Sequence, residues 1–343
     1  MKIGIAGFGK MGLLHTGILN RLEDIEIVAV AEKEGFLKKY MKEVLPKANV
    51  YEDYDTMLEK ENLDLLYITT PTGLHYPMIL SSIKKRLDFF VEKPFVKNLE
   101  EAKIICSQLK HSNIIHAVGY NLRFASTFSK AKTLLDAGIL GELNTVNSSM
   151  YVSNIFSKPK GWRFRKKESG GGVLLQFGCH LVDLLLWYFG SISTVIGSTK
   201  SVYSIVEDFA HMKMEFRNGL TGDFDTSWSK EGGYRIQETS VEIEGSNGYM
   251  KVNEDLIDIK LKNKIPEFEK LETRIYKQSL NDSVSFDIGG PEYTRQDSHM
   301  IRCVKEQKIP INNAFEASKT QSVIQAAYDS AKTNEKKIVD YIE

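Results

Sequence analysis

The stretch KIGIAGFGKMG, residues 2–12, decides the fold of this chain. Lys2–Ala6 is a predicted strand, and a helix is predicted to follow Gly12. Between them, the first glycine of a G-x-G-x-x-G pattern makes a tight turn, the second lets the backbone approach a pyrophosphate, and the third lets helix and strand pack closely. The amide groups at the helix start would bind the phosphates. The pattern therefore predicts a dinucleotide-binding loop. Its residues are Gly7, Phe8, Gly9, Lys10, Met11 and Gly12.

Glu32 supports this interpretation because it ends the second predicted strand, 20 residues after Gly12. A carboxylate at this distance accepts hydrogen bonds from a ribose 2′-hydroxyl and repels a 2′-phosphate. The sequence therefore favours NAD over NADP, although Lys33 could soften that preference. The alternative is that the glycines merely make a turn and that Glu32 is a solvated strand end.

Around this loop, the first 120 residues alternate short apolar runs with stretches of helical spacing. Such alternation gives right-handed crossovers and a parallel sheet with helices on both faces. Residues 1–120 are therefore predicted to form a doubly wound, NAD(P)-binding Rossmann domain. Strands are expected at Lys2–Ala6, Ile25–Ala31, Leu63–Thr69, Asp88–Val91 and Ile114–Gly119. Helices are expected at Leu13–Leu22, Leu37–Val44, Tyr54–Lys60, Tyr76–Lys85 and Leu99–His111.

The sequence pattern changes after Tyr120. Successive strands with turn signals at Asn218–Gly219, Gly232–Gly233 and Asn247–Gly248 predict an antiparallel sheet joined by hairpins. Residues 121–343 are therefore assigned to a second, α+β domain with a mostly antiparallel sheet. Further elements are expected at Thr127–Ala137 (helix), Leu143–Val152 (strand), Ser169–Gly190 (helix), Tyr293–Glu306 (helix) and Ala314–Thr333 (helix).

Composition narrows the class of protein. A length of 343 residues suggests two domains at roughly 150 residues each. The 45 basic and 45 acidic side chains balance, which leaves no global field to attract nucleic acid or an anionic membrane. No apolar run reaches the ~18 residues that a membrane span needs. The three cysteines offer no disulfide framework or zinc spacing and favour a reduced cytoplasm. They are Cys106, Cys179 and Cys303.

Polar residues follow the third predicted strand, at the sheet edge where ligands bind in this class of fold. The residues placed there to line the dinucleotide cleft are Thr69, Thr70, Pro71, Thr72, Leu74 and His75. For His75, the alternative is a helix N-cap or a packed ring.

Glu92-Lys93-Pro94 closes the fourth predicted strand. Pro94 biases Lys93 toward an extended backbone. A lysine here could donate a hydrogen bond to a substrate hydroxyl and stabilise alkoxide charge during hydride transfer. The alternative, an ordinary surface salt bridge, is the more common outcome for such a pair.

A glycine run at Gly170–Gly172 opens the predicted amphipathic helix of the second domain. It permits close approach of the backbone to a ligand or to another element. At roughly 100° per residue, Gln176, His180 and Asp183 fall on one helix face. His180 is the natural proton carrier near neutral pH, and Asp183 could orient it. A buried histidine satisfied by Asp183, or a solvated face, is the alternative; no third ligand is apparent, so no metal is expected.

Together these motifs resemble the glucose–fructose oxidoreductase, inositol dehydrogenase and MocA family (Gfo/Idh/MocA). The resemblance rests on the order and spacing of GFGKMG, Glu32, TTPTGLH, EKP, GWR and GGG…Gln176…His180…Asp183 along nearly the whole chain. It implies a Rossmann domain followed by a mixed α/β domain whose open sheet serves as substrate wall and oligomer interface. It also implies a tightly held nicotinamide cofactor and redox chemistry at a sugar or polyol carbon.

By motif position, Lys93 and His180 resemble the family's catalytic residues. Gln176 stands where many members carry aspartate, and a neutral amide cannot relay a proton. The positions that match cofactor contacts are Gly7, Gly9, Gly12, Glu32, Thr70, Pro71, His75, Glu92 and Lys93. Further contacts near the nicotinamide end are implied for Asn121, Trp162 and Arg163. The expected substrate-binding residues are Lys93, Arg123, Gln176, His180 and Asp183.

The leading hypothesis is a cytoplasmic, NAD(P)-dependent dehydrogenase or reductase acting on CH–OH groups of a sugar, polyol or sugar derivative. Lys93 would hydrogen-bond the reacting oxygen, His180 would exchange its proton, and Gln176 would bind a neighbouring group. The expected partners are a small carbohydrate or polyol and a second or further copy, in a homodimer or homotetramer formed through the C-terminal sheet; neither nucleic acid nor membrane is expected. One alternative is an NAD-dependent glycoside-cleaving enzyme with no net redox change, and another is a non-catalytic NAD-binding regulator.

Overall fold

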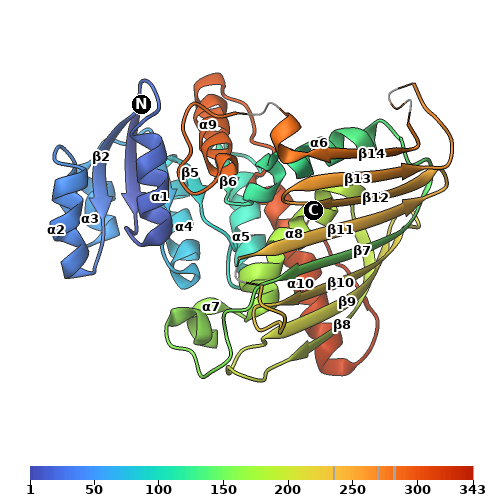
Figure 1. The fold of residues 1–343 in the computed structure, drawn as a ribbon. Helices are drawn as coiled ribbons and strands as arrows, with labels where there is room; N and C mark the ends of the chain where they lie inside the picture. The colour runs from blue at the N-terminus through green and yellow to red at the C-terminus, as the bar shows by residue number, and fades with distance from the viewer. Residues whose placement is uncertain (235, 267, 269, 281–282, 343) are drawn as a thin grey trace. The chain divides into compact units, whose positions relative to one another are not determined.

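The chain forms two compact units (Figure 1). The computed structural model describes residues 1–234, 236–266, 268, 270–280 and 283–342, without the side chains of residues 36–40. Unit 1 comprises Met1–Tyr120, Lys167–Gly170 and Val284–Ser318. Unit 2 comprises Asn121–Lys166, Gly171–Ser283 and Lys319–Glu343. The chain therefore differs from the expected single boundary after Tyr120, because Lys167–Gly170 and Val284–Ser318 join the first unit.

Unit 1 is built on a six-stranded sheet in the order β3-β2-β1-β4-β5-β6. All of its pairings are parallel, which confirms the predicted Rossmann-type sheet. The strand order reverses between β1 and β4, so ligands are expected beyond the carboxyl ends of these two strands. The strands are β1 (Lys2–Ala6), β2 (Glu26–Ala31), β3 (Asn49–Tyr51), β4 (Leu65–Ile68), β5 (Asp88–Val91) and β6 (His116–Val118).

Helices pack on this sheet because apolar side chains of the strands are fully buried. Ile3, Val30, Leu65 and Phe90 have no exposed surface, and α1 packs on β1 and β2 while α4 packs on β4 and β5. The helices of unit 1 are α1 (Lys10–Leu19), α2 (Gly35–Val44), α3 (Tyr54–Lys60), α4 (His75–Lys85), α5 (Leu99–Leu109) and α9 (Pro291–Glu306). Helix α9 lies beside α1, which explains why this late segment belongs to the first unit.

Unit 2 contains a nine-stranded sheet in the order β14-β13-β12-β11-β7-β10-β9-β8-β15. It is mostly antiparallel, as predicted, although β7 and β10 pair in parallel. The hairpins expected at Asn218–Gly219 and Asn247–Gly248 form, but the one expected at Gly232–Gly233 does not, because the described strands β10 and β11 are not neighbours. The difference arises because β7 enters the sheet between β11 and β10. The strands are β7 (Leu143–Tyr151), β8 (Ile192–Lys200), β9 (Phe209–Phe216), β10 (Thr221–Ser227), β11 (Glu238–Gly245), β12 (Gly248–Asn253), β13 (Leu256–Leu261), β14 (Glu272–Tyr276) and β15 (Lys337–Ile338).

One face of this sheet is the core of unit 2, and α8 (Cys179–Phe189) and α10 (Ala314–Thr333) lie against it (Figure 1). A Cβ on Gly197 of β8 would lie 2.6 Å from the backbone oxygen of Ala327, so strand and helix touch closely. The helical stretch Lys166–Phe189 is long and apolar enough to cross a membrane by length and composition, which the sequence analysis did not anticipate. In the structure 89% of its apolar window is buried, as in a core helix. Helix α6 (Ser126–Asp136) completes this layer.

Candidate functional site

A different structural feature explains each of the three glycines in the loop between β1 and α1. Gly7 has φ +89°, a conformation that favours glycine. A Cβ on Gly12 would lie 2.1 Å from the Gly7 carbonyl oxygen, so only glycine lets helix and turn approach this closely. A Cβ on Gly9 would meet no atom of the described residues within 4 Å. The fold therefore requires Gly7 and Gly12, whereas the open space at Gly9 fits the close approach of a pyrophosphate.

Glu32 is held over this loop by two backbone amides. Its Oε2 accepts the Phe8 N–H at 2.6 Å, and its Oε1 accepts the Glu34 N–H at 2.8 Å. The side chain is half-buried, and each carboxylate oxygen has a second acceptor position. A fixed negative charge beside a dinucleotide loop suits ribose hydroxyls and disfavours a 2′-phosphate. The residues present thus fit NAD.

The loop after β4 is tied to the glycine turn and to the Lys93 segment. The Thr69 hydroxyl donates to the Gly7 carbonyl at 2.7 Å. His75 is 1% exposed; its Nε2 lies 3.0 Å from the Thr70 carbonyl and its Nδ1 2.9 Å from the Pro94 carbonyl. Burial lowers the pKa of His75. His75 is thus a packed ring that joins two loops, the alternative left open by the sequence.

Glu92 directly follows β5 and is buried, with 5% of its surface exposed. Its Oε2 accepts the backbone N–H of Lys93 at 3.1 Å, and its Oε1 lies 3.0 Å from Nε2 of His15. A Cβ on Gly119 would come within 3.0–3.2 Å of the carboxylate. A surface salt bridge, the alternative raised by the sequence, is therefore wrong for Glu92, whose carboxylate is packed inside unit 1.

In unit 2, Gln176 lies on a π-helical turn, Leu174–Gly178, that leads into α8. Such turns are frequent at functional sites. Gln176 is 5% and His180 7% exposed, so a solvated helix face is excluded. The prediction of one shared face assumed regular α-helical rotation, and the π turn makes that rotation incorrect between Gln176 and His180.

The glycine run packs against protein. A Cβ on Gly171 would lie 2.2 Å from the Tyr328 hydroxyl, and one on Gly172 would lie 2.2 Å from the Glu207 carbonyl. The Glu207 carboxylate accepts the Gly172 and Leu174 N–H groups at 2.8 and 3.2 Å and the Tyr328 hydroxyl at 2.6 Å. Sequence reasoning missed Glu207 and Tyr328, because they lie 35 and more residues from the glycines and form no local motif.

Asp183 forms an ion pair with Arg123, a partner that the sequence did not predict. Nε and Nη2 of Arg123 donate to the two Asp183 oxygens at 2.8 and 2.7 Å, and both side chains are at most 2% exposed. This bidentate ion pair ties the 3₁₀ turn Asn121–Phe124 (η2) to α8. Elsewhere in unit 2, the Arg163 guanidinium stacks on the Trp162 ring at 5.4 Å.

The expected site residues fall into two sets, one in each unit. Unit 1 brings together the glycine loop, Glu32, the loop after β4 and the Glu92–Lys93 pair. Unit 2 holds Asn121, Arg123, Trp162, Arg163, Gln176, His180 and Asp183. Lys93 and His180 therefore belong to different units. Among the described residues, no group of three His, Cys, Asp or Glu side chains is arranged to hold a metal ion.

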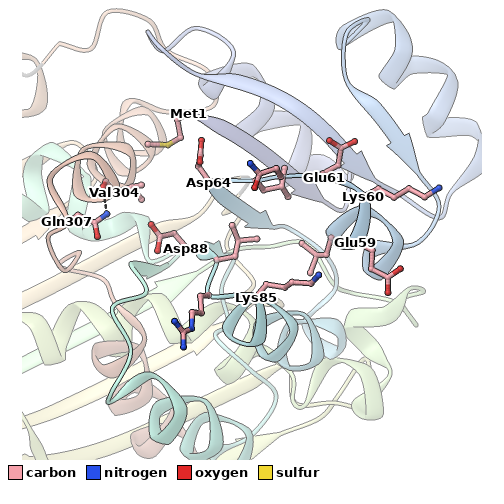
Figure 2. Close-up of a pocket in the computed structure, with 14 residues that line it drawn as sticks. Met1, Glu59, Lys60, Glu61, Asp64, Lys85, Asp88, Val304 and Gln307 are labelled. Carbon is pink, nitrogen blue, oxygen red and sulfur yellow. Dashed lines mark hydrogen bonds between the residues drawn. The ribbon is translucent and has the colours of Figure 1, made fainter.

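A cavity of about 720 Å³ in unit 1 lies at the opposite end of the sheet (Figure 2). Met1, Asp64 and Asp88, which line it, precede or begin β1, β4 and β5. Asp64 accepts the Lys2 N–H at 2.7 Å and Asp88 accepts the Ile115 N–H at 2.8 Å, so both carboxylates hold strand backbone. Because these are the amino ends of the strands, this cavity is separate from the nucleotide-binding edge.

Comparison with known proteins gives family matches in both parts of the chain. A family model described as "Oxidoreductase family, NAD-binding Rossmann fold" matches residues 1–120, and one described as "GFO/IDH/MocA C-terminal domain" matches residues 128–251. The myo-inositol 2-dehydrogenase of Thermotoga maritima is 25% identical over 256 residues, covering 72% of this chain and 74% of the relative. The scyllo-inositol 2-dehydrogenase (NAD(+)) of Bacillus subtilis is 25% identical over 350 residues, covering 96% and 94%.

Among solved structures, levoglucosan dehydrogenase in complex with NADH and L-sorbose has the same fold. Its TM-score is 0.90 at 19% identity, and the match covers 100% of this chain and 99% of that one. Together, the two family models extend over both the parallel and the mixed sheet. The chain therefore belongs to the Gfo/Idh/MocA family of oxidoreductases and carries that family's NAD-binding Rossmann domain.

Proposed function

We propose that this protein is an NAD-dependent dehydrogenase or reductase that acts on a carbinol or ketone carbon of a sugar, polyol or sugar derivative. The observation that carries the proposal is the glycine loop, where open space at Gly9 lies under a Glu32 carboxylate fixed by Phe8 and Glu34. Relatives named as inositol dehydrogenases, and a structural neighbour named levoglucosan dehydrogenase, support the substrate class. When bound, NAD supplies the hydride acceptor, or NADH the hydride donor, for this chemistry.

The chain's own residues would hold the dinucleotide at the carboxyl edge of the six-stranded sheet. The first amides of α1 have no acceptor within the helix and would bind the pyrophosphate. Glu32 would accept the ribose hydroxyls, which makes NAD the preferred cofactor; NADP is the alternative if Lys33 binds a 2′-phosphate. His75 would act through the Thr70 loop that it holds. The residues proposed to contact the cofactor are Gly7, Phe8, Gly9, Lys10, Met11, Gly12, Glu32, Thr69, Thr70, Pro71 and Leu74.

Lys93 is proposed to hydrogen-bond the reacting oxygen. Its ammonium would stabilise alkoxide charge while the carbon is oxidised or reduced. His180 would accept or donate the proton of that oxygen, directly or through water, because an imidazole titrates near neutral pH. Gln176 would bind a neighbouring hydroxyl through its amide and would not titrate.

The test of this function is a substrate screen combined with Lys93→Met. Purified protein is mixed with NAD or NADP and a panel of inositols, anhydrosugars and nucleotide sugars, and formation of the reduced cofactor is followed by absorbance. With any substrate found, Lys93→Met is expected to lower kcat by roughly a hundredfold or more, because losing one donor to a developing oxyanion costs about 10²–10³-fold. The matched control is Lys97→Met, whose lysine pairs with Glu101 at 3.3 Å and is expected to leave kcat unchanged. Near-normal turnover by Lys93→Met would remove Lys93 from the mechanism.

We also infer that the outward face of the nine-stranded sheet is the oligomer surface. On β9 and β10, His211 lies 3.6 Å from Asp223 and 3.7 Å from Asp225, and these three side chains are 40–49% exposed. A shallow cavity of about 230 Å³ lies among them. Light scattering is expected to show a dimer or tetramer, and Asp223→Arg is expected to dissociate it.

The cytoplasmic location remains a prediction. The three cysteines, on which it rests, are buried free thiols.

A further inference from the structure

Three buried ionisable side chains of unit 1 meet at the ring of His15, and one of them is Glu92, the residue before Lys93. His15 on α1 has no exposed surface. Its Nδ1 lies 2.9 Å from both carboxylate oxygens of Asp297 on α9, and its Nε2 lies 3.0 Å from Oε1 of Glu92. The two carboxylates are at most 6% exposed. This cluster joins the first helix, the end of β5 and a helix almost three hundred residues later in the chain.

The geometry favours a cationic ring at His15. Both ring nitrogens face carboxylate oxygens, and only a doubly protonated imidazolium donates to both at once. Burial by itself would lower the pKa of His15, but the carboxylates of Asp297 and Glu92 outweigh it and raise the pKa to about 10.

Aromatic rings enclose the cation. The rings of Phe90, Tyr67 and Tyr293 have centroids 5.0, 5.5 and 6.4 Å from that of His15. The Tyr67 hydroxyl donates to Asp297 at 3.4 Å. Burial raises the pKa of Tyr67 well above its usual range, and the pKa of Tyr293 is also raised, so both phenols are neutral. The titratable groups that face His15 are thus Glu92 from the end of β5, Asp297 and Tyr293 from α9, and Tyr67 from β4.

Glu92 connects the His15 ring to the backbone of Lys93. One carboxylate oxygen contacts the His15 ring, and the other accepts the Lys93 backbone N–H at 3.1 Å. Gly119 packs against the same carboxylate and leaves it little freedom to turn. The backbone from which the Lys93 side chain extends is therefore held by a carboxylate that is itself held by a buried cation.

We propose that His15 is a positioning residue for Lys93, acting as a cation that is anchored by Asp297 and fixes the Glu92 carboxylate. The inference rests on the proposed catalytic function of Lys93. Without the cation, two buried carboxylates would face each other with no compensating charge, and Glu92 would move or take up a proton. Either change releases the Lys93 backbone N–H from its present acceptor.

The first experiment compares His15→Gln with His116→Gln in the full chain. Glutamine keeps a donor and an acceptor but has no charge, and His116 is an equally buried histidine of unit 1 outside the cluster. With a substrate from the screen, His15→Gln is expected to lower kcat about tenfold to a hundredfold with little change in KM, because a displacement of about 1 Å can lower a rate that much. The kcat of His116→Gln is expected to stay at the wild-type value. Wild-type kcat in His15→Gln, while Lys93→Met is inactive, would overturn the inference and leave the proposed function standing.

Two further measurements do not depend on turnover. In wild-type protein, ¹⁵N NMR of the imidazoles is expected to show both nitrogens of His15 protonated at pH 8; a neutral ring there would overturn the inference. Reductive methylation followed by mass spectrometry reports the environment of the Lys93 ammonium. Its rate is expected to change severalfold in His15→Gln and not in His116→Gln, and an unchanged rate would also overturn the inference. If His15→Gln does not fold, Asp297→Asn, which keeps the side-chain shape, is measured instead.

Discussion

Adding one methyl group at each of two glycines should separate folding from cofactor binding. In Gly12→Ala, the new Cβ would lie 2.1 Å from the Gly7 carbonyl oxygen, so β1 and α1 must move apart. Forced overpacking of this kind costs typically about 1–3 kcal/mol of unfolding free energy. In Gly9→Ala, the new Cβ would meet no described atom within 4 Å, and φ −71°, ψ −163° is open to alanine. Only the weak N-cap preference of glycine over alanine is lost, roughly 1 kcal/mol or less.

The two variants are expected to behave oppositely in two assays. Denaturant unfolding without cofactor should show Gly12→Ala destabilised and Gly9→Ala close to wild type. Fluorescence titration with NADH should show Gly9→Ala weakened at least tenfold, about 1.4 kcal/mol, because its methyl group occupies the space through which a pyrophosphate reaches the helix amides. Gly12→Ala is read only in the unfolding assay.

The reasoning is refuted by either of two results. NADH affinity at the wild-type level in Gly9→Ala would mean that the pyrophosphate does not approach this backbone. Unchanged unfolding free energy in Gly12→Ala would mean that the loop relaxes without loss and that the close approach of helix and turn is not needed.

Three other predictions concern charge. Glu32→Ala should reduce the ratio of NADP to NAD dissociation constants at least tenfold, measured by titration, because it removes a charge that repels a 2′-phosphate; an unchanged ratio would assign the selectivity to another residue. Arg123→Met should lower the unfolding free energy of unit 2 by about 3–5 kcal/mol, because Asp183 is left buried without its cation. In the same denaturant unfolding assay, the double variant Arg123→Met with Asp183→Leu should recover part of that loss. No recovery would contradict the pairing. Burial lowers the pKa of His116 to about 4. Its neutral ring therefore stabilises the folded state by about 3 kcal/mol above pH 6.5, and this contribution to the unfolding free energy is lost as the pH falls toward 4. Urea unfolding at pH 7 and pH 4.5 should show a steeper loss for wild type than for His116→Gln, and equal losses would disprove it.

Local pattern predicted the bounds of several elements, short ones included, but missed two of the shortest strands. The bounds of β1, β5, α3 and α10 agree with the sequence expectation. The three residues of β3 and two of β15 were missed, since periodicity needs a longer window than these strands provide. The parallel pairing of β7 with β10 was missed because it depends on which strand enters between two others.

In the candidate site, too, local motifs could be predicted from the sequence, whereas contacts between distant residues could not. Residue types and motif spacing indicated the glycine loop, Glu32, Lys93 and the helix face that carries Gln176 and His180. The resemblance then supported the catalytic roles of Lys93 and His180. Partners could not be predicted in this way. Asp183 pairs with Arg123, 60 residues away, and His15 meets Asp297, 282 residues away. One feature of the sequence did indicate that His15 is buried. It lies at helical spacing from Ile18 and Leu19, which are buried, and thus on an apolar helix face.

The insertion of Val284–Ser318 into unit 1 has a consequence for biosynthesis. Domains generally fold as units, the N-terminal one first as the chain emerges from the ribosome. Here the first 120 residues lack α9, and His15 would lack its Asp297 partner until residue 297 has been translated. The dinucleotide-binding unit is therefore expected to reach its final packing only after the mixed sheet between its segments has been made. Nascent chains of this protein thus present an incomplete nucleotide-binding unit to chaperones for most of their synthesis.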